Sequence, residues 1–324
     1  MRSWTRYRYG GPEVLNLEEL PMPEPAPDSM VIEVHRASLN AMDWHLMRAS
    51  PFFVRFDTGL LKPKDRRIGG DAAGVVTAVG AEVQGYAVGD RVFGESGLGA
   101  FAQYVRVKPQ YMAKLPDGVS MDDASALPVA GLTAIQAVRR SGRVATGEAV
   151  LVNGASGGVG SYALQIAVAD GAEVTGVCSS RNVELVRSLG ATDVIDYTQT
   201  DFRKADAQYD VIIDAVGNVD LKDLVRCLKP GGRAVVVGFT TMGRMMAIQI
   251  FGKGAGKKHG VEVGSMLAKA STTDLESLAD LVASGKMKPV IDRHYPLDQV
   301  TDAIAYLETM RARGKVIIDI LTPA

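Results

Sequence analysis

The stretch AVLVNGASGGVGSYALQIAVAD, residues 149–170, decides the fold of this chain. Its first part, Ala149–Asn153, is a short apolar run typical of a buried strand. Glycines cluster after it, and residues 157–170 then follow the pattern of a helix. The run is uncharged from Ala149 to Ala169, but a membrane-spanning helix would not gather glycines in its middle. The stretch therefore predicts a strand, a tight turn and a helix.

The same alternation of strand and helix extends from Met121 to about residue 265. Strand-like apolar runs lie at residues 173–178, 194–196, 210–214 and 234–238. Helix-like runs lie at residues 182–189, ending at Gly190, and at residues 221–228, where Pro230-Gly231-Gly232 is expected to stop the helix. Continuous apolar strands separated by helices predict a parallel sheet covered on both faces.

The two ends of the chain follow other patterns. Residues 1 to about 120 contain short strand-like runs at 31–34, 74–79 and 91–93 between frequent glycines, which is typical of a barrel or sandwich. After about residue 266, the pattern predicts helices at 273–284 and 297–310, the first starting at Thr272 or Thr273. A closing strand is expected at 315–320.

Composition narrows the class of protein. The 324 residues suggest about two domains, and the formal net charge of −1 argues against a broad basic surface for nucleic acid. The two cysteines, Cys178 and Cys227, can build neither a disulfide framework nor a four-thiolate zinc site. The basic start is not followed by an apolar stretch, so it is no secretory signal. We expect a cytoplasmic protein that binds neither nucleic acid nor membrane.

The glycine-rich turn has the features of a phosphate-binding loop. Asn153–Gly160 reads N-G-A-S-G-G-V-G, with the spacing G-x-x-G-x-x-G and with Ala155 at the place of the usual first glycine. Glycines let a backbone approach a pyrophosphate, and the following helix start offers free N–H groups. We expect the cofactor to contact Ala155, Ser156, Gly157, Gly158 and Val159. The alternative is a glycine-rich turn that holds no ligand.

The end of the second strand favours NADPH over NADH. An NAD site usually has a carboxylate there, which holds the ribose hydroxyl. This chain instead has Ser179, Ser180 and Arg181, which can donate hydrogen bonds to a 2′-phosphate. Alternatively, Arg181 is a solvated residue at a helix start.

With these motifs, the chain resembles a zinc-free medium-chain dehydrogenase/reductase of the quinone-oxidoreductase-like branch. The resemblance extends over nearly the whole chain and is carried by four segments, at residues 69–92, 127–134, 209–217 and 313–316. It implies a GroES-like β-rich catalytic domain at 1–122 and 266–324 and a Rossmann domain with a doubly wound parallel sheet at 123–265. It also implies a homodimer.

The resemblance indicates why no metal is expected. Asn40 stands where zinc-dependent relatives have a cysteine ligand, and Gly70-Asp71 replaces their histidine and glutamate. The lobe of four closely spaced cysteines is missing, and the four histidines have no metal-ligand spacing. Without a Lewis acid, conjugated acceptors are easier to reduce than simple alcohols or aldehydes.

The resemblance also places a catalytic segment near the nicotinamide. Asn40 is expected to donate a hydrogen bond to a substrate carbonyl as negative charge develops. Asp43 either takes part in the chemistry or fixes the local loop. His45 is either a proton donor or a structural histidine. Trp44 is either core or wall of the substrate site, and Phe52 and Phe53 are expected to form an apolar wall.

Further residues are carried over to the cofactor. The set comprises Asn40, in addition to its role at the substrate, and Thr133, Tyr197, Val216, Gly217, Gly238, Phe239, Thr240 and Lys315. We interpret the methionines at 242–246 as core or dimer packing, or as a pliable substrate wall. The lysine cluster at 253–258 is expected to be a solvated loop, or alternatively a loop that lies over the cleft.

Three functions remain open. The first is an NADPH-dependent reductase of quinones or α,β-unsaturated carbonyls, which are small electrophilic substrates. The second is a zinc-free reductase, such as an enoyl reductase, dedicated to one biosynthetic intermediate. The third is a non-enzymatic, regulatory NADPH-binding protein, because a fold does not guarantee an activity.

Overall fold

The computed structural model describes residues 1–205 and 207–321, which divide into two compact units. Unit 1 contains Met1–Leu132, Ala270–Ser284 and the chain from Pro289 onward. Unit 2 contains Thr133–Lys269 and Gly285–Lys288. The functional division into a catalytic domain at 1–122 and 266–324 and a nucleotide-binding domain at 123–265 stays a prediction.

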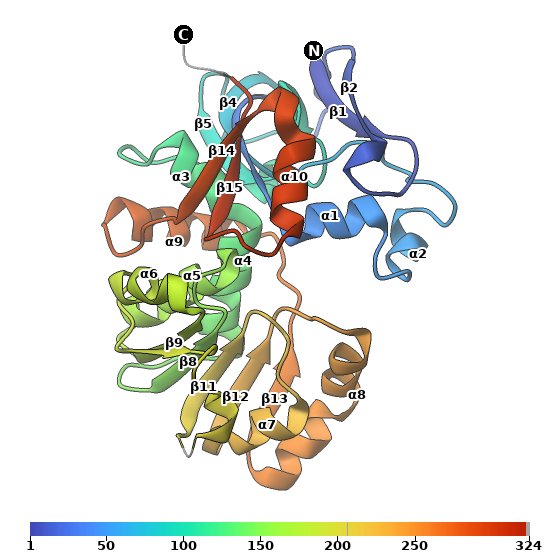
Figure 1. The fold of residues 1–324 in the computed structure, drawn as a ribbon. Helices are drawn as coiled ribbons and strands as arrows, with labels where there is room; N and C mark the ends of the chain where they lie inside the picture. The colour runs from blue at the N-terminus through green and yellow to red at the C-terminus, as the bar shows by residue number, and fades with distance from the viewer. Residues whose placement is uncertain (206, 322–324) are drawn as a thin grey trace. The chain divides into compact units, whose positions relative to one another are not determined.

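Unit 2 is built on a parallel sheet of six strands, in the order β10-β9-β8-β11-β12-β13 (Figure 1). The strands are β8 (Ala149–Asn153), β9 (Glu173–Cys178), β10 (Asp193–Asp196), β11 (Tyr209–Asp214), β12 (Leu228–Val236) and β13 (Glu262–Ser265). The connecting helices are α5 (Gly158–Ala169), α6 (Val183–Ser188), α7 (Leu221–Arg226) and α8 (Met242–His259). The predicted parallel sheet is confirmed, and its strand order is that of a dinucleotide-binding fold.

Two details of unit 2 differ from the sequence-based expectation. Helix α7 ends at Arg226, before Pro230-Gly231-Gly232, and these three residues lie inside β12, where the register with β11 shifts. The lysine cluster at 253–258 is not a loop but the last part of α8. Its glycines serve close packing instead of a turn, because a Cβ at Gly252 would lie 2.8 Å from the Val263 backbone oxygen and one at Gly256 would lie 2.5 Å from that of Val261. Small residues therefore let α8 pack closely against β13.

The methionines at the start of α8 do not belong to the core. Met246 is 48% exposed, and Met242 and Met245 are half-buried. Ile248 is the buried apolar residue of this helix instead.

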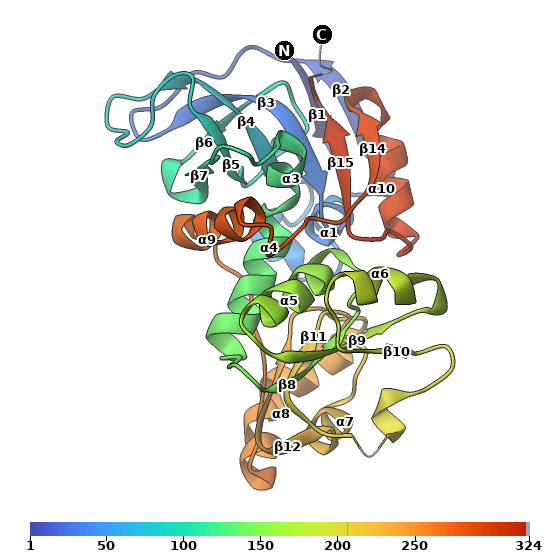
Figure 2. The same ribbon diagram turned by 90° about the vertical axis from the view of Figure 1, so that its left-hand side faces the viewer.

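Unit 1 is built on a mixed sheet in the order β14-β15-β3-β4-β5-β7, with β6 paired to β3 (Figure 2). The strands are β3 (Met30–Leu39), β4 (Asp71–Val79), β5 (Arg91–Glu95), β6 (Tyr104–Val107), β7 (Met112–Lys114), β14 (Ile291–Pro296) and β15 (Lys315–Asp319). A separate hairpin is formed by β1 (Arg2–Arg6) and β2 (Leu15–Glu19). Because β15 pairs with β3, strands from both chain ends share one sheet and one core.

Helices border the unit 1 sheet. They are α1 (Ala41–Arg48), α2 (Val54–Thr58), α3 (Met121–Ala126), α4 (Pro128–Ile135, which continues into unit 2), α9 (Thr272–Ala283) and α10 (Val300–Glu308). The N-cap of α9 is Ser271, whose hydroxyl accepts from the Asp274 N–H, and not Thr272 or Thr273. The helix expected at 297–310 begins with a 3-10 turn and becomes α-helical only from Val300. Within residues 1–205 and 207–321, we find no helix with the length and apolar character of a membrane span.

The close approach of β3 and β4 depends on Gly74. A Cβ at this position would lie 2.0 Å from the Glu33 carbonyl oxygen, where β3 departs from regular register. Gly74→Ala is expected to lower the free energy of unfolding by about 3 kcal/mol, because backbone atoms cannot move aside easily. Urea unfolding followed by far-UV circular dichroism measures this, because that signal reports both unit 1, which contains Gly74, and unit 2, which contains the control position. The control is Gly264→Ala, because no atom lies within 4 Å of its added Cβ. Equal stability of the two variants would contradict the prediction.

Candidate functional site

A buried cation, amide and carboxylate meet in unit 1 where β3 ends and β15 begins. The Lys315 Nζ donates to the Asn40 Oδ1 at 2.5 Å and lies 3.2 Å from the Asp71 Oδ2. The Asn40 Nδ2 donates to the same Asp71 oxygen at 2.8 Å. Lys315, Asn40 and Asp71 are 3%, 7% and 0% exposed. We call these three residues the buried triad.

Further donors compensate the charge of Asp71. The Ser38 hydroxyl donates to its Oδ2 at 2.9 Å, and the Val129 N–H donates to its Oδ1 at 3.0 Å. A buried carboxylate is stable only with such a set of partners. Neither Asp71 nor Ser38 was predicted as a site residue: the sequence placed Asp71 only where zinc-dependent relatives have a glutamate ligand, and Ser38 lies in no motif.

Asp43 lies at the start of α1, next to the buried triad. Its Oδ2 accepts from the Asn40 N–H at 2.7 Å, as in a capping box. Burial raises the pKa of Asp43 to about 7, and the negative charge of Asp71 adds to this effect. Its Oδ1 is buried without a hydrogen-bond partner among the described residues. The contact at Asn40 N supports a positioning role for Asp43, and a chemical role stays a prediction.

Trp44 and His45 stack on each other, with ring centroids 3.7 Å apart. Trp44 packs against the unit 1 core. The His45 Nδ1 lies 2.7 Å from the Ser50 carbonyl oxygen, and burial lowers the pKa of this histidine. His45 is therefore mainly neutral at pH 7, and its role as a proton donor stays a prediction.

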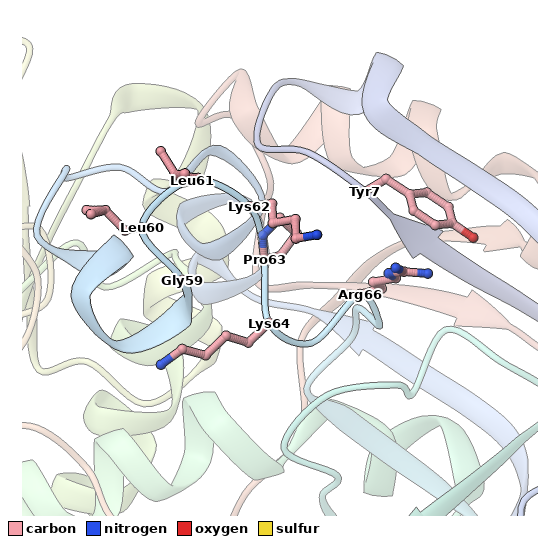
Figure 3. A pocket seen from close by; sticks show the side chains of 8 residues that line it. All are labelled: Tyr7, Gly59, Leu60, Leu61, Lys62, Pro63, Lys64 and Arg66. Carbon is pink, nitrogen blue, oxygen red and sulfur yellow. The ribbon is translucent and has the colours of Figure 1, made fainter.

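Phe52 and Phe53 lie on an exposed apolar surface. They are 61% and 41% exposed, and Phe56, Leu60 and Leu61 extend this surface, with Leu61 88% exposed. The sequence reasoning missed these last three residues, whose exposure no motif marks. Figure 3 shows an open pocket beside them, lined by Tyr7, Gly59, Leu60, Leu61, Lys62, Pro63, Lys64 and Arg66.

In unit 2, the glycine-rich loop has the shape that a pyrophosphate requires. Gly154 has a φ of +84°, and a Cβ at Gly160 would lie 2.1 Å from the Gly154 oxygen. Helix α5 begins at Gly158, so the N–H groups of its first turn have no acceptor within the helix. Ser156, Gly157 and Val159 are partly exposed on this loop.

Ala155 differs from its neighbours in the loop. It is 0% exposed, and its N–H donates to the Val177 oxygen at 3.0 Å. A Cβ at Gly176 would lie 3.1 Å from the Ala155 Cβ. The alanine is thus directed into the fold, and its expected contact with the cofactor stays a prediction.

The segment after β9 is connected to the loop by Asn182. Its buried amide donates to the Ser156 hydroxyl at 2.9 Å, while Ser179 is partly exposed and Arg181 is exposed. The Ser180 hydroxyl lies 2.8 Å from that of Thr198.

The next strand supplies a carboxylate close to Ser180. Hydrogen bonds, chiefly from Ser180, lower the pKa of Asp196 at the end of β10. Tyr197 follows it and is 60% exposed. Asp196 and Asn182 were not expected from the sequence.

The loops after β8, β11 and β12 are joined at the carboxyl ends of the strands. The Asn153 amide donates to the Asp214 carboxylate at 2.8 Å, and that carboxylate also accepts from the N–H groups of Val216 and Gly217. The Thr240 hydroxyl donates to the Gly217 oxygen at 3.0 Å. Open parallel sheets bind ligands at this edge.

The remaining residues expected at the cofactor lie on neighbouring elements. Gly238 and Phe239 follow β12, and Thr133 lies on α4; all three are half-buried. A Cβ at Gly217 would lie 2.1 Å from the Gly238 oxygen, so these two loops pass very close to each other.

The donors present do not fit zinc. The buried triad offers one amide and one carboxylate, and an ammonium group already lies between them. The described residues also bring together Asp122, His294 and Asp319, with ligand atoms within 4.8 Å of one another. The Arg36 guanidinium contacts both carboxylates of that group, at 2.6 and 3.1 Å, and compensates their charge.

Two family models match, an alcohol dehydrogenase GroES-like domain at residues 26–117 and a zinc-binding dehydrogenase at residues 189–318.

Two relatives and one solved structure are similar over nearly the whole chain. The 2-methylene-furan-3-one reductase of Solanum lycopersicum is 34% identical, over 98% of this chain and 79% of that protein. The quinone oxidoreductase of Homo sapiens is 31% identical, over 98% of this chain and 97% of that protein. The structure of the quinone oxidoreductase from Coxiella burnetii has a TM-score of 0.88 and 31% identity, and the match covers 99% of each chain.

The buried triad predicts a large effect of removing its cation. Lys315→Met is expected to lower the free energy of unfolding by about 3–5 kcal/mol, because it leaves the Asp71 charge buried and unpaired. Adding Asp71→Asn should recover part of this loss, since the second change removes that charge. Urea unfolding of the two single variants and the double variant measures the coupling. Strictly additive effects would show that Lys315 and Asp71 do not interact.

Proposed function

The chain belongs to the quinone-oxidoreductase-like branch of the medium-chain dehydrogenase/reductase superfamily, a group of NAD(P)H-dependent oxidoreductases, and we propose that it uses NADPH to reduce a quinone or an α,β-unsaturated carbonyl. The observation that carries the proposal is the buried triad, an amide held by an ammonium where zinc-dependent relatives hold a metal. Such a site has no Lewis acid, so it suits an acceptor in which conjugation delocalises the negative charge that develops when hydride is added.

The cofactor proposal rests on the loops at the carboxyl edge of the unit 2 sheet. Ser156 to Val159 would hold the pyrophosphate, and Ser179, Ser180 and Arg181 the 2′-phosphate. When bound, NADPH supplies the hydride. Asp196 is a negative charge near this position, and hydrogen bonds from Ser180 and Thr198 partly compensate it.

Asn40 has the donor needed for the substrate. One of its two amide hydrogens is donated to Asp71, so the other can donate to a substrate oxygen. The Lys315 ammonium on the Asn40 Oδ1 polarises the amide and strengthens this donor. Phe52, Phe53 and Phe56 would form an apolar wall for the rest of the substrate. A homodimer and a cytoplasmic location stay predictions.

The reaction is tested by NADPH oxidation with a panel of acceptors. The panel holds a benzoquinone, a naphthoquinone, an alkyl enone, an enal and an enoyl thioester. We expect turnover with quinones or with enones and enals, and little with the thioester. Turnover with the thioester alone would indicate a dedicated enoyl reductase. Tight NADPH binding without turnover of any acceptor would instead favour a non-enzymatic role.

The preference for NADPH is tested separately at Arg181. Arg181→Ala should raise the KM for NADPH about tenfold or more, because a charge-assisted hydrogen bond contributes about 1.5–3 kcal/mol. The KM for NADH should change little, because NADH has no 2′-phosphate. Steady-state kinetics with both cofactors measure the difference. Arg187→Ala is the control, because this exposed arginine pairs with Glu184 on α6, away from the proposed 2′-phosphate position. An equal rise in both KM values would contradict the assignment.

A further inference from the structure

A row of polar side chains crosses the unit 1 sheet and ends at a glutamate without a role in the proposed function. In register, Ser38 on β3 pairs with Asp71 on β4, and Asp71 pairs with Glu95 on β5. Directly opposite residues of an antiparallel pair project to the same face, with Cβ atoms about 4.5–5.5 Å apart. Lys315 lies two residues before Ile317, the partner of Ser38, so it projects to that face too. Glu95 is therefore the last polar residue of the row that holds the buried triad.

Glu95 differs from the other two acids near the triad. Asp71 accepts hydrogen bonds from Asn40, Ser38 and Val129, and Asp43 accepts from the Asn40 N–H at the start of α1. The described residues donate no hydrogen bond to the Glu95 carboxyl group, which is half-buried. It is thus the acid of this row that can both reach a ligand and exchange a proton with solvent.

We propose that Glu95 donates the proton that completes the reduction of an α,β-unsaturated carbonyl substrate. The inference rests on the proposed function. Hydride addition to the β-carbon moves the electron pair of the C=C bond toward the carbonyl and leaves an enolate. The O–H bond of the Glu95 carboxyl then breaks, and a C–H bond forms at the α-carbon. Water returns a proton to the Glu95 carboxylate. A quinone needs no such donor, because water can protonate hydroquinone oxygens.

The protonation state of Glu95 agrees with this role. Burial raises the pKa of Glu95 to about 7, and the negative charge of Asp71 adds to the effect. A substantial fraction of the carboxyl groups is therefore protonated at neutral pH, where an ordinary glutamate is almost entirely ionised.

The other charged groups around Glu95 are compensated by their own partners. Asp71 on β4 pairs with Lys315 on β15, and Lys114 on β7 pairs with Asp90. On α3, Asp122 pairs with Arg36, and Asp123 accepts from Ser120. Asp43, at the start of α1, is the second acid here whose pKa is raised to about 7. Any experiment must therefore separate Glu95 from Asp43.

The test compares Glu95→Gln with wild-type enzyme on one enone and one quinone. For wild type, kcat with the enone should fall as pH rises through about 7, because the protonated acid is lost. Glu95→Gln should lack this decline, and its ratio of enone to quinone turnover should fall at least about tenfold. Glu95→Asp, which keeps an acid, should recover part of the ratio. Glu82→Gln is the control, because Glu82 is exposed on a loop of the same unit.

A second measurement needs neither cofactor nor substrate. The carboxyl ¹³C resonances of glutamate-labelled protein should include one that titrates near neutral pH and that Glu95→Gln removes. If this resonance remains, or if the pH-dependent decline persists in Glu95→Gln and disappears in Asp43→Asn, the assignment to Glu95 is wrong. An unchanged enone-to-quinone ratio in Glu95→Gln also overturns it. Absence of turnover by wild-type enzyme with either acceptor would contradict the proposed function instead.

Discussion

The contact between the Lys315 ammonium and the Asp71 carboxylate is the constraint on which unit 1 depends. Both groups are almost completely buried, so neither charge is hydrated. A buried ion pair is weak evidence for stability as such, but each partner needs the other once both are inside. The pair also holds the Asn40 amide, because the amide accepts from the lysine and donates to the carboxylate. One interaction therefore joins β15 to β4 and orients the Asn40 side chain, just after β3, that we propose contacts the substrate.

The loops of unit 2 are positioned by close packing of their backbones and not by a buried ion pair. Its loops approach each other so closely that glycines are required where they meet, at Gly160 against Gly154 and at Gly217 against Gly238. Buried side chains then connect the loops, with Asn153 bound to Asp214 and Asn182 bound to Ser156. The result is a set of fixed loops at the carboxyl edge of the sheet, which is where such folds bind nucleotides.

The sequence was most informative where the pattern is local and strongly periodic. The bounds of β8 and β9 agree with the predicted runs, because each is a continuous apolar strand flanked by turn residues. The prediction of a loop at residues 253–258 was wrong, because the glycines there let α8 pack closely and do not form a turn. The prediction that Pro230-Gly231-Gly232 stops a helix was also wrong, because these residues lie at an irregularity inside β12. Local preference cannot show that a neighbouring backbone lies within van der Waals contact.

The site was only partly predictable for a related reason. Asn40 and Lys315 were found through family motifs, but no motif connects them to Ser38 or Glu95. Those residues come together through strand register, which brings side chains from distant parts of the chain to one face. Register is a property of the assembled sheet, so a single sequence does not show it.

The position of β15 has a consequence for how the protein is made. This strand lies between β14 and β3, yet it is synthesised long after β3. All of unit 2 is synthesised before it, so the parallel sheet can form while the sheet of unit 1 still lacks the strand that joins β14 to β3. Until residue 315 emerges, Asp71 has no lysine partner and β3 has an open edge. The proposed catalytic centre is thus assembled only after unit 2 has been synthesised, and a nascent chain cannot be active before residue 315 has left the ribosome.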